Sequence, residues 1–168
     1  MKKEKNRCAW CGNDSLLSEY HDREWGKPIK DDNKLFERIT MEVFQAGLSW
    51  KIILIKREAF KKAFVGFDIK KVAKFKEPQI SKLLDDKSII RNHRKIYATI
   101  YNANSIMKIQ KEYGSFYNFI KKLDTNADLV KQMKMHFKFM GKETTTCFLM
   151  GCGRIKPHHD KNCFLYKG

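Results

Sequence analysis

The amino-acid sequence predicts an all-α protein that forms a single domain over residues 1–168. Most segments of the chain carry hydrophobic residues at helical rather than alternating spacing. Only three prolines occur in the chain, which contains neither a low-complexity stretch nor an internal repeat. With 42% hydrophobic residues, a chain of this length can bury a sizeable core. We therefore expect a bundle of helices joined by short connections.

The first two expected helices combine an apolar stripe with a start or stop signal. Asp32 can cap a helix that runs toward Gly47. A second helix covers about residues 50–64, and Gly66 follows it as a terminator. Their stripes consist of Leu35, Phe36, Ile39, Val43, Trp50, Ile53, Leu54, Phe60 and Phe64. Burying a helix face is the ordinary role of such a stripe, so these residues are expected in the core.

The later helices show the same signals. They are expected at about residues 68–75, 78–84, 96–114, 115–120 and 129–135. Asp68 and Ser115 stand where helices begin, Pro78 suits a first helical turn, and Gly114 ends the longest stripe. The apolar residues of these helices are Ile69, Val72, Phe75, Ile80, Leu83, Leu84, Ile96, Ile100, Ala103, Met107, Phe116, Ile120, Leu129, Met133 and Met135.

The two ends of the chain, about residues 1–30 and 153–168, show little helical signal but are rich in cysteine and histidine. Thiolate and imidazole groups in sets of four are the ligands that tetrahedral zinc prefers. A metal ion held by both ends would tie down segments that otherwise fray. The residues alone leave two choices open, Cys8 or Cys11 and His158 or His159, beside His21 and Cys163.

Charge and cysteine usage limit the class of protein. The formal net charge of +16 attracts polyanions, of which nucleic acid is the commonest, although a lysine-rich proteome would give the same excess. No segment is apolar enough to span a membrane, and no hydrophobic signal-peptide core follows the basic start. Five cysteines without an export signal favour reduced thiols or a metal site over disulfides. We expect a cytoplasmic protein.

Three short strings are unusual for a plain helical bundle. They cover residues 20–26, 41–50 and 137–141, and read Tyr-His-Asp-Arg-Glu-Trp-Gly, Met-Glu-Val-Phe-Gln-Ala-Gly-Leu-Ser-Trp and Phe-Lys-Phe-Met-Gly. The three tryptophans, Trp10, Trp25 and Trp50, lie close in sequence to a glutamate or to a candidate metal ligand. These strings are therefore candidates for a binding site.

Glu42 is the acidic residue of greatest interest in these strings. Ile39 and Phe36 precede it on the same apolar helix, so its side chain is expected to point partly inward. A carboxylate in an aromatic setting is costly unless it meets a cation. A positively charged ligand would satisfy the carboxylate and would also make cation–π contacts with the rings. The alternative is that Glu42 pairs with a lysine at the helix surface.

Together these strings resemble the DNA-3-methyladenine glycosylase I family of the helix-hairpin-helix superfamily. The likeness is carried by Cys8-x-Trp10, Tyr20-His21-Asp22-x-Glu24-Trp25-Gly26, Glu42-x-x-Gln45-Ala46-Gly47-Leu48-Ser49-Trp50, Ile89-Ile90-Arg91-Asn92 with Lys95-Ile96, and Phe137-Lys138-Phe139-Met140-Gly141. It spans nearly the whole chain. The resemblance implies a helix-hairpin-helix glycosylase bundle over about residues 31–152, with the hairpin near residues 87–96.

The resemblance also implies one structural zinc ion, Zn²⁺. Its ligands in this chain would be Cys8, His21, His159 and Cys163, so that residues 1–30 and 153–168 form a zinc lobe. The carboxy-terminal segment has one more residue before His159 than the family pattern, which leaves His158 as an alternative ligand.

The functional residues implied by the resemblance form two groups. The pocket for the damaged base would use Glu42 as the catalytic carboxylate together with Tyr20, Trp10, Trp50 and Gln45. The hairpin would grip DNA phosphates with backbone amides and with the side chains of Arg91, Asn92 and Lys95. This chain departs from the family pattern at Ser88, where glycine is usual, and at Lys142-Glu143, where a threonine-containing step is usual.

The activity implied is release of 3-methyladenine from double-stranded alkylated DNA, by a monomer, without a membrane partner. The enzyme would flip the damaged nucleotide from the helix and hydrolyse its N-glycosidic bond, leaving an abasic site. No aspartate occurs between Lys95 and Asp124, which agrees with a monofunctional hydrolase of this family. Two rival functions are a module that binds alkylated bases without cutting and a zinc-containing nucleic-acid-binding protein with no base pocket.

Overall fold

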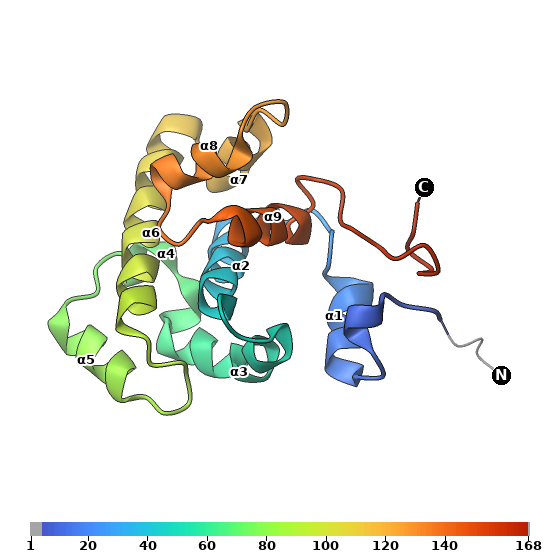
Figure 1. Ribbon diagram of the computed structural model, residues 1–168. Coiled ribbons are helices and arrows are strands. Elements are labelled where there is room, and N and C mark those ends of the chain that lie inside the picture. Colours follow the sequence, from blue (N-terminus) through green and yellow to red (C-terminus); the bar gives the residue numbers. More distant parts are fainter. Residues whose placement is uncertain (1–4, 168) are drawn as a thin grey trace.

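The computed structural model describes residues 5–167, and every regular element within them is helical. In chain order the elements are η1 (Ala9–Cys11), α1 (Ser15–Arg23), α2 (Asp32–Gln45), α3 (Trp50–Ala63), η2 (Val65–Phe67), α4 (Ile69–Val72), α5 (Glu77–Asp85), α6 (His93–Tyr113), α7 (Phe116–Lys122), α8 (Leu129–His136) and α9 (Lys142–Gly151) (Figure 1). None of the described helices is long and apolar enough to span a membrane. The prediction of an all-α fold is confirmed.

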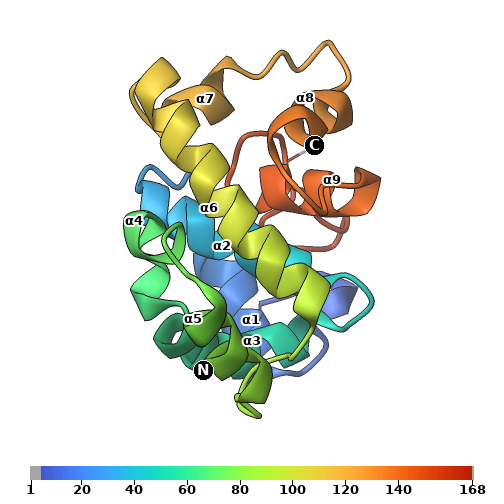
Figure 2. The same ribbon diagram turned by 90° about the vertical axis from the view of Figure 1, so that its left-hand side faces the viewer.

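Helix α2 lies at the centre of the molecule. It contacts α3, α6, α7 and α9, and α6 crosses in front of it with α4 and α5 on one side and α8 and α9 on the other (Figure 2). Because neighbours surround it, α2 buries polar residues as well as its apolar stripe. Arg38, Thr40 and Glu42 are all less than 4% exposed. A buried charged group is costly unless it is paired, so Arg38 and Glu42 indicate a site rather than ordinary packing.

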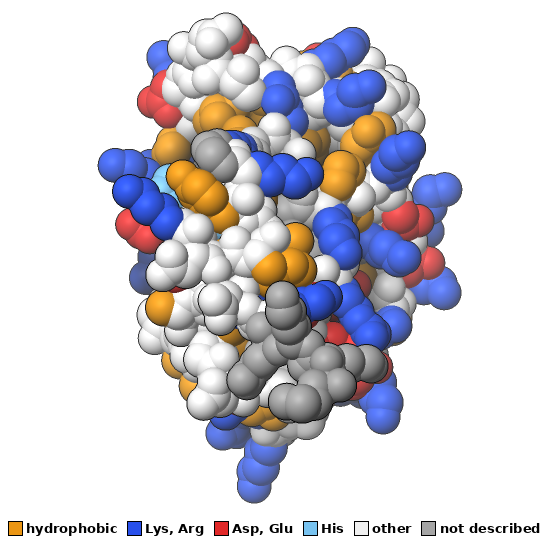
Figure 3. Space-filling view, turned by 90° about the vertical axis from the view of Figure 1, so that its right-hand side faces the viewer, with side chains coloured by type: hydrophobic (Ala, Val, Ile, Leu, Met, Phe, Trp, Pro, Cys, Tyr) orange, Lys and Arg blue, Asp and Glu red, His pale blue; other side chains and the backbone are white. Residues whose placement is uncertain are grey.

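The ends of the chain meet at one side of the molecule. Helix α1, the 3-10 turn η1 and the last described residues lie together there, away from α5 and α6 (Figure 1). On the face of the molecule that carries these segments, Lys and Arg side chains outnumber Asp and Glu (Figure 3). This distribution agrees with the net charge of +16.

Local signals set most helix boundaries as expected. Asp68 and Ser115 each accept a hydrogen bond from a backbone amide of the helix that they begin, and Pro78 lies in the first turn of α5. Gly114 ends α6 with φ of 82°, a left-handed conformation that suits glycine. The cap of α2 is Asp31 rather than Asp32, because the carboxylate of Asp31 accepts from the amide of Lys34.

The carboxylate of Asp32 has a different role. It accepts hydrogen bonds from the backbone amides of Phe116 and Tyr117 and from the side chain of Gln110. These bonds join the start of α2 to α6 and to the start of α7. Asp32 therefore acts through tertiary contacts, which local sequence signals do not report.

Two helices were not expected from periodicity. Helix α1 buries only Tyr20 and His21, so its inner face is aromatic and polar rather than aliphatic. Helix α9 begins with a lysine, a glutamate and three threonines, and threonine is a weak helix former. Packing of Phe148 and Leu149 in the core next to α2 stabilises α9 instead. The expectation of little helical structure before residue 30 was therefore wrong.

Candidate functional site

A cavity of about 330 Å³, here called the aromatic pocket, opens between η1, α1, α2, α3 and α9. Its lining residues are Trp10, Tyr20, Trp25, Glu42, Gln45, Trp50 and Cys147. The volume suits a small planar molecule, and rings supply most of the wall. All five residues that the sequence assigned to a base pocket therefore line one cavity.

Glu42 provides the acidic group of the aromatic pocket. Its side chain is 2% exposed, which confirms the inward orientation and excludes the alternative of a surface pair with lysine. Burial raises the pKa of Glu42 to about 7, and the nearby cation of Arg38 opposes that rise. The carboxylate is thus poorly solvated, and a positively charged ligand would restore favourable contacts.

The aromatic walls lie close to one another. The ring centroids of Tyr20 and Trp50 are 5.2 Å apart, and those of Tyr20 and Trp25 are 6.2 Å apart. Trp10 packs edge-on against Tyr20 at 6.2 Å and is 40% exposed, so part of its ring remains accessible beside the pocket. The faces of such rings attract cations, as the carboxylate does. The pocket is therefore complementary to a planar cation.

Gln45 has a supporting contact in addition to its place in the lining. Its side-chain amide donates to the backbone carbonyl of Leu48 at 3.3 Å. This bond bridges the turn between α2 and α3, which carries Gly47 with φ of 84°. Gln45 therefore helps to fix the connection that places Trp50 against the pocket.

Arg38 is a buried residue of this site that the sequence analysis did not identify. It is 3% exposed, and one of its guanidinium nitrogens donates a hydrogen bond to the hydroxyl of Tyr20. The guanidinium carbon lies 4.7 Å from the centroid of the Tyr20 ring and 5.6 Å from that of Trp50. Its ion-pair partner is Glu24, at 3.6 Å. The sequence feature that could have identified Arg38 is its position four residues before Glu42, because residues four apart lie on the same face of a helix.

Trp25 and Cys147 also line the aromatic pocket without having been assigned to it from the sequence. Trp25 belongs to the first unusual string, but nothing in that string shows which way the ring points. Burial, followed by the charge of Glu42, raises the pKa of the Cys147 thiol to about 11. Cys147 therefore presents a neutral thiol to the pocket, and it reaches the pocket from α9, a helix that periodicity did not reveal.

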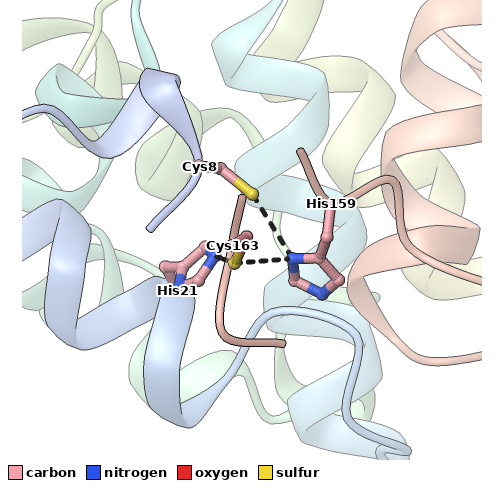
Figure 4. A group of neighbouring side chains, drawn as sticks. All are labelled: Cys8, His21, His159 and Cys163. Carbon is pink, nitrogen blue, oxygen red and sulfur yellow. Dashed lines mark hydrogen bonds between the residues drawn. The ribbon is translucent and has the colours of Figure 1, made fainter. Parts of the chain in front are cut away.

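A second group of side chains, the metal cluster, consists of Cys8, His21, His159 and Cys163 (Figure 4). Their ligand atoms all lie within 4.8 Å of one another. Cys8 Sγ is 3.4 Å from His159 Nδ1, and Cys163 Sγ is 3.4 Å from His21 Nε2 and 3.7 Å from His159 Nδ1. A tetrahedral zinc site has ligand-to-ligand distances of about 3.3–3.8 Å. The cluster could thus hold a metal ion, and its donors fit zinc.

Outer contacts orient these ligands. His21 Nδ1 lies 2.9 Å from a carboxylate oxygen of Asp22, which leaves Nε2 facing the cluster. The backbone amide of Asp160 donates to Cys8 Sγ, and that of Leu165 donates to Cys163 Sγ, each at 3.4 Å. These backbone contacts fix the positions of the two sulfur atoms in the metal cluster.

The structure also shows which of the alternative candidate ligands lie in the metal cluster. Cys11 is buried beside the metal cluster but does not belong to it, and burial raises the pKa of its thiol to about 11. His158 is exposed, whereas the ring of His159 points into the cluster (Figure 4). The set implied by the family resemblance is the set that the fold brings together.

The predicted hairpin connects α5 to α6 through residues 86–92. Asp86 accepts hydrogen bonds from both the amide and the hydroxyl of Ser88, which stabilise the turn where the family pattern has glycine. Arg91 is exposed, whereas the side chain of Asn92 caps α6 by accepting from the amide of Lys95. Asn92 is also exposed, but its side-chain oxygen is engaged in the cap, so Arg91 is the exposed cation among the three expected side chains.

Lys95 differs from its expected role. Its side chain is 7% exposed, and its ammonium donates to the carbonyls of Phe44 at 2.9 Å and Ala46 at 2.6 Å. These carbonyls belong to the end of α2, where the helix leaves acceptors without intrahelical partners. A phosphate contact by this ammonium is not supported, because the group is already bound inside the protein.

Comparison with known proteins gives a consistent result. A model of the family described as methyladenine glycosylase matches residues 10–136. The chain is 34% identical over 173 residues to the DNA-3-methyladenine glycosylase of Haemophilus influenzae, a match that covers 90% of this chain and 94% of that protein.

Solved structures agree in fold as well as in sequence. A crystal structure of 3-methyladenine DNA glycosylase I superposes with a TM-score of 0.87 at 34% identity and covers 96% of this chain and 100% of its own. A variant of 3-methyladenine DNA glycosylase I in complex with 3-methyladenine gives a TM-score of 0.83 at 30% identity, with 95% of this chain and 96% of its own covered.

Proposed function

Because this chain belongs to the methyladenine glycosylase family, we propose that its aromatic pocket receives 3-methyladenine flipped out of double-stranded alkylated DNA. The protein is a DNA N-glycosylase that hydrolyses the N-glycosidic bond of 3-methyladenine and releases the free base. The buried carboxylate of Glu42 within the ring-lined cavity is the observation that carries the proposed site.

Charge explains why such a pocket would select the damaged base. Methylation at N3 makes the adenine of the nucleotide cationic, whereas undamaged adenine is neutral. Glu42 would attract the cation, and the faces of Trp10 and Trp50 would add cation–π contacts. Hydrogen bonds from Tyr20 and to Glu42 would orient the base. A neutral adenine would leave the buried carboxylate without a counterion, which is costly.

The same charge lowers the demand on catalysis. A cationic purine leaves with the electron pair of the bond between C1′ and N9, and it departs as neutral 3-methyladenine. Water then adds to C1′ and loses one proton to solvent, which gives the abasic sugar. From its contact with the base, the carboxylate of Glu42 would stabilise the positive charge that base and sugar share in the transition state. Flipping the nucleotide costs roughly a few kcal/mol, less for a damaged base.

The metal cluster would hold Zn²⁺ as a structural ion. Its four ligands come from two segments that are more than one hundred residues apart in sequence, Cys8 with His21 and His159 with Cys163. Four protein ligands leave no open position for substrate or water. The ion would therefore fasten the carboxy-terminal segment against η1 and α1, which carry Trp10 and Tyr20 of the aromatic pocket.

The activity itself is tested by base release. The protein is incubated with methylated and with unmethylated double-stranded DNA, and the released bases are identified by mass spectrometry. We expect free 3-methyladenine from the methylated DNA alone, with one new abasic site for each base and no strand break. Retention of the methylated DNA without base release would contradict the proposal and would indicate a module that binds without cutting.

Phosphate contacts give a further testable expectation. Arg91 is exposed on the hairpin, so the Arg91→Ala variant should bind DNA more weakly whatever the sequence. The slope of log K against log salt should fall in magnitude by about 1, because one fewer counterion is released. Fluorescence anisotropy at several salt concentrations measures both quantities. Lys95→Met should leave the slope unchanged, since that ammonium is bound to backbone carbonyls.

A further inference from the structure

The contact between Arg38 and Tyr20 places a buried cation behind the wall of the aromatic pocket. The guanidinium donates to the Tyr20 hydroxyl and lies over the Tyr20 ring at 4.7 Å. Both side chains are nearly inaccessible, with 3% of each exposed. A buried charge that forms a hydrogen bond in this way restricts the geometry of its partner strongly.

The donors and acceptors of the Arg38 guanidinium and the Tyr20 hydroxyl determine which hydrogen bonds the hydroxyl can form. Guanidinium has only donors, so the oxygen of Tyr20 must accept from Arg38. The single hydroxyl proton then points away from Arg38 and can be donated to another group only. Among the residues that line the pocket, Glu42 is the acceptor whose charge influences Tyr20; a base in the pocket would supply another.

We propose that Arg38 is a positioning residue that makes the hydroxyl of Tyr20 a hydrogen-bond donor toward the base and thereby favours methylated adenine over methylated guanine. This inference rests on the proposed function of the aromatic pocket. It goes further because it assigns a role to a residue outside the pocket lining and connects that role to base selection.

The selection follows from the edges of the two purines. Adenine presents an amino group, a donor, beside a ring nitrogen that accepts. On the Watson–Crick edge, which a flipped base presents, N1 of adenine accepts a hydrogen bond whereas N1 of guanine carries a hydrogen. Glu42 can accept from the adenine amino group while Tyr20 donates to N1. In guanine, a Tyr20 hydroxyl that Arg38 holds as a donor would face the N1–H donor. Guanine presents a carbonyl oxygen at the position of that amino group, and this oxygen would face the carboxylate of Glu42. Two acceptors facing each other leave a buried polar pair unsatisfied, which discriminates strongly.

Arg38 is not placed beside Tyr20 as the ion-pair partner of Glu42. The ion pair of Arg38 is with Glu24, which also accepts from Arg57 at 2.7 Å. Arg57 in turn contacts Glu37 at 2.6 Å. The two cations are thus matched by Glu24 and Glu37, and the negative charge of Glu42 remains for the ligand. Arg38 also lowers the pKa of Glu42 through its charge, but this effect does not need the hydroxyl of Tyr20, so variants with and without that hydroxyl separate the two effects.

A double-mutant cycle tests the inference. The variants are Arg38→Met, Tyr20→Phe and the double variant, and the readouts are the dissociation constants of free 3-methyladenine and 3-methylguanine from tryptophan fluorescence. Arg38→Met should weaken 3-methyladenine binding about tenfold and reduce its preference over 3-methylguanine by a similar factor. In the Tyr20→Phe background the same substitution should leave the preference unchanged and should weaken 3-methyladenine binding by a smaller factor, because no hydroxyl remains to be oriented.

Two control variants separate positioning from general stability. Arg57→Met removes another cation bound to Glu24 that does not touch Tyr20, so any loss should be equal in both backgrounds. Arg38→Lys retains a donor and should recover most of the preference for 3-methyladenine. If Arg38→Met does not fold, Arg38→Leu, which likewise has neither a charge nor a hydrogen-bond donor, provides the same comparison.

The outcomes distinguish this inference from the proposed function. Equal losses from Arg38→Met in the two backgrounds, or an unchanged preference between the two bases, would overturn the role of Arg38 while base release by the wild type stands. If the wild type neither binds nor releases 3-methyladenine, the proposed function fails and the inference fails with it.

Discussion

Glu42→Gln should lower kcat/KM for release of 3-methyladenine from methylated DNA about 100-fold, which corresponds to a loss of about 3 kcal/mol in transition-state stabilisation. Glutamine preserves the shape and a hydrogen-bond acceptor but removes the charge that would attract the cationic purine. Single-turnover base release by the wild type and the variant, with helix content compared by circular dichroism, measures the effect.

A matched control for the loss of charge is Glu58→Gln, because Glu58 is exposed on α3. This variant should release the base at the wild-type rate. Equal activity of Glu42→Gln and the wild type would contradict the role assigned to Glu42, whereas a similar loss in both variants would indicate a general effect of net charge.

The pH dependence should have opposite signs for activity and for stability. Burial raises the pKa of Glu42 to about 7, so kcat/KM should fall below that pH as the carboxylate is protonated. The folded protein holds this proton up to a higher pH than the unfolded chain does. Stability therefore decreases as the pH rises from about 4.5 to 7, by about 3 kcal/mol for this group. Glu42→Gln should remove both dependences and should raise the melting temperature at pH 8.

Loss of a metal ligand should have the largest effect on stability. With Zn²⁺ in the metal cluster as proposed, Cys163→Ser, or treatment of the wild type with a strong chelator, should remove the ion and lower the melting temperature by about 10 °C. The physical reason is that the metal cluster joins the carboxy-terminal segment to η1 and α1. Metal analysis of the purified protein by mass spectrometry, combined with calorimetry, tests both statements.

Cys11→Ser provides the control for this prediction. Cys11 is as buried as the ligands Cys8 and Cys163 and lies in the same part of the molecule, but it is outside the metal cluster. This variant should retain one zinc ion per chain. Stoichiometric zinc in Cys163→Ser would contradict the assignment of Cys163 as a ligand, and loss of zinc in Cys11→Ser would contradict the choice of Cys8 over Cys11.

The sequence predicted helix ends correctly where a capping side chain or a glycine lies next to the end in sequence. Asp68 and Ser115 begin helices because a side chain accepts from an amide three residues later, and Gly114 ends α6 because it adopts positive φ. Such signals involve neighbours in sequence, so they can be read without a fold. Helices α1 and α9 lack strong aliphatic stripes, and their stability comes from tertiary contacts instead.

The sequence by itself determined the helical architecture, the basic charge, the supply of metal-binding side chains and, through its strings, the family resemblance. Only the tertiary structure decided which side chains meet. It put Arg38 against Tyr20, brought Cys147 to the aromatic pocket, and bound Lys95 to backbone carbonyls. The physical reason is that helix formation depends on spacing along the chain, whereas burial, hydrogen bonding and ligand geometry depend on distances between segments that are remote in sequence.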